Sequence, residues 1–228
     1  CSYARTTAVA SSTAFCLSAD SVEVGDGLAL ALAEDEVEAV AVGLAIGLVA
    51  GYFRRIDAVV MRLMDGLMAI PSLLLAIALV SLLGASVKVV IVAIVIPEIP
   101  RVTRLVRAVV LSVRDLPYVE AARSIGTRVG TLLRRHIWPS TVAPLIVQAT
   151  YICASAILTE AGLSFLGAGT PPEFPTWGNM IASSRLYLQI APWTIFAPGI
   201  CLALVVLAVN LLGDGLRDRL DPRISRRM

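Results

Sequence analysis

Charged residues are scarce in this sequence. Only 16% of its 228 residues are Asp, Glu, Lys or Arg, whereas about a quarter of the residues in soluble domains are charged. Hydrophobic residues make up 57% of the chain, and the mean hydropathy is +0.83. This composition excludes an ordinary soluble domain and indicates a membrane protein, in which the placement of charge matters more than its sum.

Lysine and histidine each occur once, and this scarcity argues against several classes of enzyme. Lys88 stands in SVKVV, so the chain has no G-x-x-x-x-G-K-[ST] loop for ATP, and we expect any ATP-driven motor to be another chain. His136 cannot form the H-E-x-x-H pair of zinc proteases alone. Ser164 in GLSFLG would need an activating histidine, and His136 lies at the other end of the same predicted crossing. We therefore predict a protein that is not an enzyme, with no catalytic residues, cofactor or metal site.

The cysteines show no spacing typical of metal ligands or redox pairs. The last two fall inside apolar runs, where cysteine behaves as a small core residue. We therefore expect no disulfide framework among the four: Cys1, Cys16, Cys153 and Cys201.

The amino end, residues 1–36, is atypical. It has neither the basic start nor the continuous apolar core of a signal peptide, and AEDEVEA places four acidic residues beside an apolar run. A missing start, a damaged reading frame, a disordered segment or an amphipathic lead-in would each account for this pattern. We predict that residues 37–228 form the transmembrane domain.

Five apolar runs predict an all-α bundle with about five membrane crossings. A spanning helix needs roughly 20 apolar residues, and three runs meet this length with no Asp, Glu, Lys or Arg. Two weaker runs are short, and the second of them must extend to residue 110 to span. In chain order the runs are residues 39–53, 66–87, 89–97, 139–159 and 186–213.

Basic residues fall mainly in the segments that alternation places on one side of the membrane. Three lie between the first two runs, eight between the third and fourth, and five in the carboxyl tail. By the positive-inside rule, this side is cytoplasmic. Three arginines recur every third residue at the end of the third run, and we interpret them as anchors for anionic headgroups: Arg101, Arg104 and Arg107.

A polar stretch between the third and fourth runs reads DLPYVEAARSIGTRVGTLLRRHIWPST, residues 115–141. Asp115 can cap a helix with Pro117 in its first turn, and Gly126 suits the left-handed turn that ends it. Thr127 can cap a second, basic helix. The pattern predicts a short cytoplasmic helix followed by a turn and a helix, although a solvated loop that only fixes topology would fit the spacing equally well.

This stretch resembles the EAA motif of ABC-importer permeases. EAARSIG is followed after ten residues by IWP, as the family's Glu-Ala-Ala, three residues, Gly and downstream Ile-x-Pro would require. ILTEAGLSFLGAGTPPEFPTWGNMI and NLLGDGLRDRLDPR resemble the dipeptide, oligopeptide and nickel branch of that family. The likeness runs from about Gly47 to Arg223. Trp138 stands where the family usually has Leu, and we expect this chain to lack the additional amino-terminal crossing and external segment that family members generally carry.

The resemblance implies an inner-membrane permease subunit that forms half of a translocation pathway for peptides or a related solute such as nickel. It implies ATPase subunits on the cytoplasmic side, a second permease subunit, which could be identical or different, and an external solute-binding protein. The short helix would couple ATPase motion to the spanning helices through six residues: Glu120, Ala121, Ala122, Gly126, Ile137 and Pro139.

Two alternatives remain open at this point. A truncated, non-functional permease would share all of these motifs, and a secondary transporter would work without ATPase partners. The latter would require membrane-embedded ionisable residues or an internal repeat, and neither is convincing here. Glu160, near the external end of the fourth run, could line the pathway, contact a binding protein or simply contact water. The sequence does not identify the substrate.

Overall fold

The computed structural model describes residues 37–220, and every regular element in that range is helical. The all-α prediction is therefore confirmed. The predicted amino-terminal segment, residues 1–36, and the last three arginines of the tail lie outside the described residues. In chain order the elements are a helix Val37–Tyr52, α3 (Arg54–Met68), α4 (Ser72–Leu83), α5 (Val87–Val95), α6 (Glu98–Val113), α7 (Pro117–Ser124), α8 (Val129–Leu132), the π-helix η1 (Leu133–Ile137), α9 (Trp138–Phe165), α10 (Trp177–Ser184), the 3-10 turn η2 (Arg185–Tyr187) and α11 (Trp193–Leu220).

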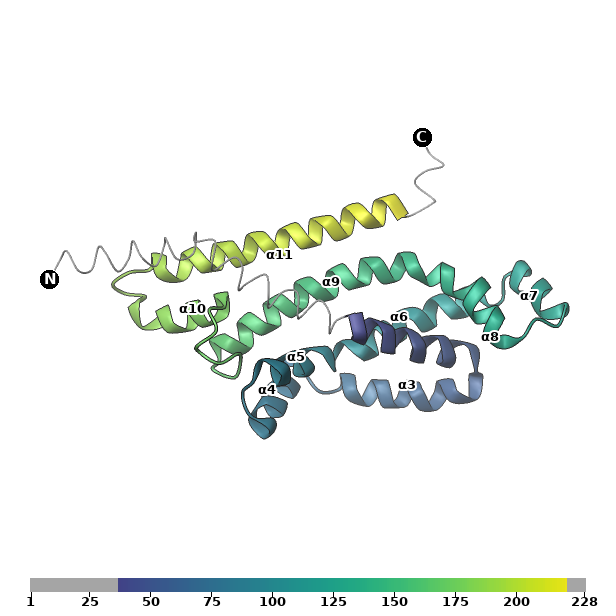
Figure 1. The fold of residues 1–228 in the computed structure, drawn as a ribbon, viewed down its shortest axis with the longest axis horizontal. Coiled ribbons are helices and arrows are strands. Elements are labelled where there is room, and N and C mark those ends of the chain that lie inside the picture. Colours follow the sequence, from purple (N-terminus) through teal and green to yellow (C-terminus); the bar gives the residue numbers. More distant parts are fainter. Residues whose placement is uncertain (1–36, 221–228) are drawn as a thin grey trace. The chain divides into compact units, whose positions relative to one another are not determined.

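The helices, shown in Figure 1 in the order of the chain, belong to two compact units. Among the described residues, the first unit contains residues 73–94 and 153–209, and the second contains residues 37–72, 95–152 and 210–220. The second unit carries the polar stretch with the EAA-like motif. The first carries the segment between the two longest apolar helices.

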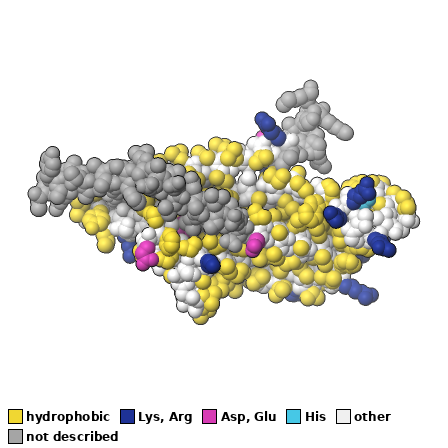
Figure 2. Space-filling model, viewed as in Figure 1, with side chains coloured by type: hydrophobic (Ala, Val, Ile, Leu, Met, Phe, Trp, Pro, Cys, Tyr) yellow, Lys and Arg dark blue, Asp and Glu magenta, His cyan; other side chains and the backbone are white. Residues whose placement is uncertain are grey.

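Two of the predicted crossings coincide with helices long and apolar enough to span a membrane. Residues Val129–Phe165 form 37 residues of continuous helix, and its apolar stretch of 18 residues has a mean hydropathy of 1.7; Trp193–Arg219 form 27 residues, with a mean hydropathy of 2.5 over a stretch of the same length. At 1.5 Å per residue, both exceed the roughly 30 Å of the hydrocarbon core. Apolar side chains accordingly cover much of the surface (Figure 2).

The second and third apolar runs are not single straight helices. The run at residues 66–87 is broken between α3 and α4, which are bent by 80° at a break that contains Pro71. The third run divides into α5 and α6 around Pro97. Proline lacks a backbone N–H and disfavours the helical conformation in the residue before it. By length and composition, the described residues thus provide two spanning helices, or three if the bent pair counts as one, compared with the five predicted runs.

A row of glycines brings the helix Val37–Tyr52 into close contact with α6. A Cβ atom added at Gly47 would lie only 2.7 Å from the Cβ of Val106. Cβ atoms added at the other two glycines of the row would lie equally close to the valines that face them. Small residues allow two helix backbones to approach in this way. The facing valines are fully buried and lie in the core of the second unit. The three pairs are Gly43 with Val102, Gly47 with Val106, and Gly51 with Val110.

The arginines of α6 pair with carboxylates of the same chain. Arg107 donates to both carboxylate oxygens of Asp57 on α3, with 2.6 Å between Nη2 of Arg107 and Oδ2 of Asp57. Arg104 forms an ion pair with Asp65, which lies nearer the end of α3. Arg101 pairs with Glu98 in its own helix. The interpretation of these arginines as headgroup anchors therefore needs revision, because each has a carboxylate partner that joins or braces helices within the unit.

The glycine row generates a stability prediction. Gly47→Ala should lower the apparent melting temperature of the detergent-purified protein, because the new methyl group would overlap Val106 and the carbonyl oxygen of Thr103; overpacking of this kind costs about 1–3 kcal/mol. Gly66→Ala in α3 is the matched control. Its Cβ would meet nothing within 4 Å, and alanine is favoured over glycine inside a helix by about 0.5–1 kcal/mol. Equal melting temperatures for the two variants would contradict the close approach.

Candidate functional site

The candidate site is the stretch that joins α6 to α9, at residues 114–139. α7 begins at Pro117, whose fixed φ suits the first helical position. Its N-cap residue is Leu116, and no side chain caps it. The expectation that Asp115 caps this helix is therefore wrong: Asp115 pairs instead with Arg114, at 3.5 Å between carboxylate oxygen and Nε. The expected Thr127 cap is also wrong, because α8 has Arg128 at its N-cap.

Gly126 ends α7 in the left-handed conformation that the sequence predicts, with φ of +82°. Its N–H donates to the carbonyl of Arg123 at 3.0 Å, and the next N–H, from Thr127, donates to the carbonyl of Ala122 at 3.2 Å. This pair of bonds is the Schellman motif, which satisfies carbonyls that a helix end would otherwise leave unpaired. The short helix is thus closed at a defined residue.

α7 has one face against the core of its unit and one face exposed. Val119 and Ala122 are buried, at 2% and 9% exposure, in the same core cluster as Leu132 and Ile137. On the other face, Tyr118 is 46% exposed and Ile125 is 84% exposed. An apolar side chain as exposed as Ile125 on a capped, anchored helix is a candidate contact for a partner protein.

The six residues predicted from the motif divide between these two environments. Glu120, Ala121, Gly126 and Pro139 are exposed. Ala122 and Ile137 are buried and contribute to the core that holds α7 in place. The structure therefore brings Ala122 and Ile137 together inside the chain, and it leaves Glu120 and Ala121 on the surface beside Tyr118.

A π-helical turn, which the sequence does not predict, separates α8 from α9. Residues Leu133–Ile137 form this turn immediately before α9. It carries two arginines and His136, whose ring lies 6.5 Å from that of Tyr118 on α7. Figure 2 shows basic side chains and the histidine at the α7–α8 end of this unit. A π-turn is a rare feature that often marks functional sites.

A buried carboxylate is the second candidate group, and it lies in the other unit. Glu160, near the end of α9, is only 6% exposed. Its carboxylate accepts hydrogen bonds from the hydroxyls of Ser164, at 2.7 Å, and Thr170, at 3.2 Å. Asn179 of α10 donates to the Thr170 hydroxyl at 3.2 Å. Of the alternatives left open for Glu160, simple contact with water does not fit this burial. The partners of its carboxylate tie the loop after α9 and α10 to the end of α9.

The residues that the structure describes contain no group of three or more His, Cys, Asp or Glu side chains that could hold a metal ion. The polar stretch offers groups that can recognise a partner: a short helix closed at Gly126, exposed apolar side chains and arginines. These features suit contact with a partner.

Comparison with known proteins identifies the family. Residues 43–226 match the family model described as the binding-protein-dependent transport system inner membrane component. The chain is 66% identical over 178 residues to a probable peptide ABC transporter permease from Sinorhizobium fredii, an alignment that covers 78% of this chain and 61% of that protein. It is 46% identical over 184 residues to the dipeptide transport system permease protein DppC of Alkalihalophilus pseudofirmus, covering 80% and 60% respectively.

The fold has a relative among solved structures. A chain from a structure of the MetNI methionine ABC transporter in inward-facing conformations superimposes with a TM-score of 0.63, covering 85% of this chain and 93% of that one. The sequences are 17% identical, so this likeness concerns the fold alone. The chain spans about three fifths of the length of the curated relatives it matches. It belongs to the family of inner membrane components of binding-protein-dependent transport systems.

Proposed function

We propose that this chain acts as the permease subunit of an ATP-driven importer and that α7 couples it to a separate ATPase. The observation that carries the proposal is the two-sided construction of α7. Its buried face joins it to the core of its unit, so a push on its exposed face would move the helices behind it. The proposed contact surface consists of Tyr118, Glu120, Ala121 and Ile125.

The anchoring of α7 suits the transmission of force. Val119 and Ala122 pack into the core cluster that also holds Val106 and Val110 of α6 and Ile152 of α9. Packed interiors are close to incompressible and respond by switching between arrangements rather than by bending. Nucleotide-driven movement of the ATPase would therefore bias the permease between inward-open and outward-open states.

The proposed cargo is a short peptide or a related solute. Named relatives include a probable peptide permease and a dipeptide permease, and another, from Pectobacterium atrosepticum, is a glutathione transport system permease at 44% identity. We further propose a second permease subunit, an external solute-binding protein, and a cytoplasmic location for α7 and the carboxyl end. The positive-inside distribution of arginine supports that orientation.

Crosslinking tests the coupling proposal. A cysteine would replace Ala121 in a variant whose four native cysteines are replaced. A short crosslinker with a maleimide and an N-hydroxysuccinimide ester should join this cysteine to lysines of a co-expressed candidate ATPase. The yield should change with ATP. Because this chain contains one lysine, internal products will be few. A cysteine at the exposed Ser183 of α10 is the control, since it should lie on the other side of the membrane. Crosslinking at Ser183 but not at Ala121, in inserted protein, would contradict the proposal.

The neighbouring alanines of α7 provide a second test. Ala122→Leu should lower the melting temperature, because Ala122 is buried and overpacking costs about 1–3 kcal/mol. Ala121→Leu should leave the melting temperature unchanged, because Ala121 is exposed, while reducing ATP-dependent uptake in proteoliposomes by about tenfold, the effect of roughly 1.4 kcal/mol at an interface. Normal uptake by the Ala121→Leu variant would argue that the exposed face is not a docking surface.

A further inference from the structure

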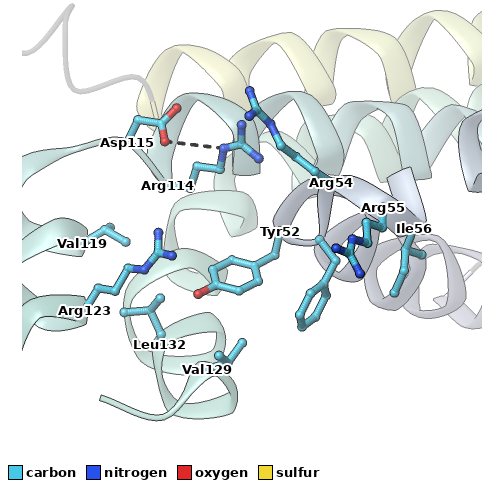
Figure 3. Close-up of a pocket in the computed structure, with 11 residues that line it drawn as sticks. Tyr52, Arg54, Arg55, Ile56, Arg114, Asp115, Val119, Arg123, Val129 and Leu132 are labelled. Atoms are coloured by element: carbon cyan, nitrogen blue, oxygen red, sulfur yellow. Dashed lines mark ion pairs between the residues drawn. The ribbon is translucent and has the colours of Figure 1, made fainter. Parts of the chain in front are cut away.

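A cavity of about 830 Å³ lies beside α7, within the second unit (Figure 3). Its walls come from the end of the helix Val37–Tyr52, the start of α3, the end of α6, and from α7 and α8. Val119 and Leu132 form an apolar floor, since both are buried. The rim includes Phe53 and Ile56, each 42% exposed.

The lining of this cavity is strongly basic. It contains four arginines and a single carboxylate. The carboxylate, Asp115, is 77% exposed and lies 3.5 Å from Arg114. Arg114 also donates to the backbone carbonyl of Gly51 at 3.0 Å, so it is held in place by two groups of the chain. The other three arginines are Arg54, Arg55 and Arg123.

None of these three arginines forms an ion pair with a residue among positions 37–220. The contrast with α6 is informative, because each of its arginines at positions 101, 104 and 107 has a carboxylate within the unit. Like charges that share one concave site repel each other and raise the local concentration of anions. The fold thus supplies carboxylates to one set of arginines and leaves a second set facing a cavity.

We propose that this cavity, which we call the arginine pocket, binds a phosphate-bearing anion. A guanidinium presents several N–H donors in a planar fork that matches the oxygens of a phosphate, and such charge-assisted bonds are among the strongest available. Figure 3 shows the Arg123 side chain of α7 extending toward the Tyr52 ring, whose hydroxyl can add a further donor. Arg54 and Arg55 belong to the start of α3; in the figure Arg54 extends toward Arg114, and Arg55 lies on the Phe53 and Ile56 side of the lining.

The phosphate can come from a lipid headgroup or from a free anion. The size of the pocket favours the headgroup, because small-ligand sites occupy roughly 300–1,000 Å³ and a lone phosphate ion would fill only a small part of this one. The exposed apolar rim at Phe53 and Ile56 offers a place for the start of an acyl chain. Basic pockets beside membrane helices recognise anionic headgroups by the same chemistry.

Binding to the purified chain tests the proposal without any ATPase or transport assay. The probes are dihexanoyl phosphatidylglycerol, dihexanoyl phosphatidylcholine and inorganic phosphate, and the readout is the ligand concentration needed to raise the melting temperature. Phosphatidylglycerol should stabilise the protein at lower concentrations than phosphatidylcholine. Greater potency for phosphatidylglycerol than for inorganic phosphate assigns the anion to a lipid, and equal potency assigns it to free phosphate; both results support the site.

Two pairs of matched variants locate the binding. Arg55→Gln and Arg123→Gln should each weaken binding of the anion by about tenfold, the usual effect of losing one charge-assisted hydrogen bond. Arg62→Gln, also on α3, and Arg128→Gln, at the start of α8, remove the same charge from positions outside the lining and should leave binding unchanged.

Three outcomes would overturn the proposal. If neither phosphatidylglycerol nor inorganic phosphate stabilised the protein, the pocket would not be an anion site. If all four variants weakened binding equally, the effect would come from the net charge of the protein and not from the pocket. A third outcome would reassign the pocket to an acidic segment of a partner protein: Arg55→Gln and Arg123→Gln would abolish crosslinking to the ATPase while leaving anion binding unchanged. Failure of the coupling proposal would not affect these results, because they are obtained with the permease chain alone.

Discussion

The close contact between the helix Val37–Tyr52 and α6 is the constraint on which the rest of the second unit depends. Three glycines allow three valines of α6 to pack directly against the backbone of the helix Val37–Tyr52. This contact fixes the position and direction of α6. The ion pairs of Arg104 and Arg107 with α3 then hold a third helix against the same element. Since α7 starts four residues after α6 ends, the position of the coupling helix follows from this packing.

The proposed role of α7 requires a helix of eight residues to be stable and also to leave one face exposed, and these requirements usually conflict. A helix this short is unstable alone, because nucleation is unfavourable. Here Pro117 begins it, Gly126 closes it, and two buried side chains anchor it. That support comes from one face, so the opposite face is left exposed with Tyr118 and Ile125 on it. The arginine pocket lies at the anchored side, where α3, α6 and α8 meet α7.

Much of this arrangement is predictable from local sequence signals. Pro117 and Gly126 mark the ends of α7 to within two residues, and the two longest helices follow from uninterrupted apolar runs. The breaks at Pro71 and Pro97 are also local, because each contains a proline, but apolar content alone does not reveal them. The carboxylate partners of the α6 arginines could not be foreseen, because Asp57 and Asp65 are about 40 to 50 residues away in sequence. Burial of Ala122 likewise depends on long-range packing.

The central claim is that α7 has an anchored face and a docking face, and labelling with a water-soluble maleimide along the helix tests it most directly. Single cysteines at positions 118, 119, 121, 122 and 125 would be compared in the permease alone and with the ATPase bound. The account predicts rapid labelling at 118, 121 and 125 that the ATPase suppresses, with slow labelling at 119 and 122 in both cases. Unchanged labelling at all three exposed positions in the assembled complex would contradict it.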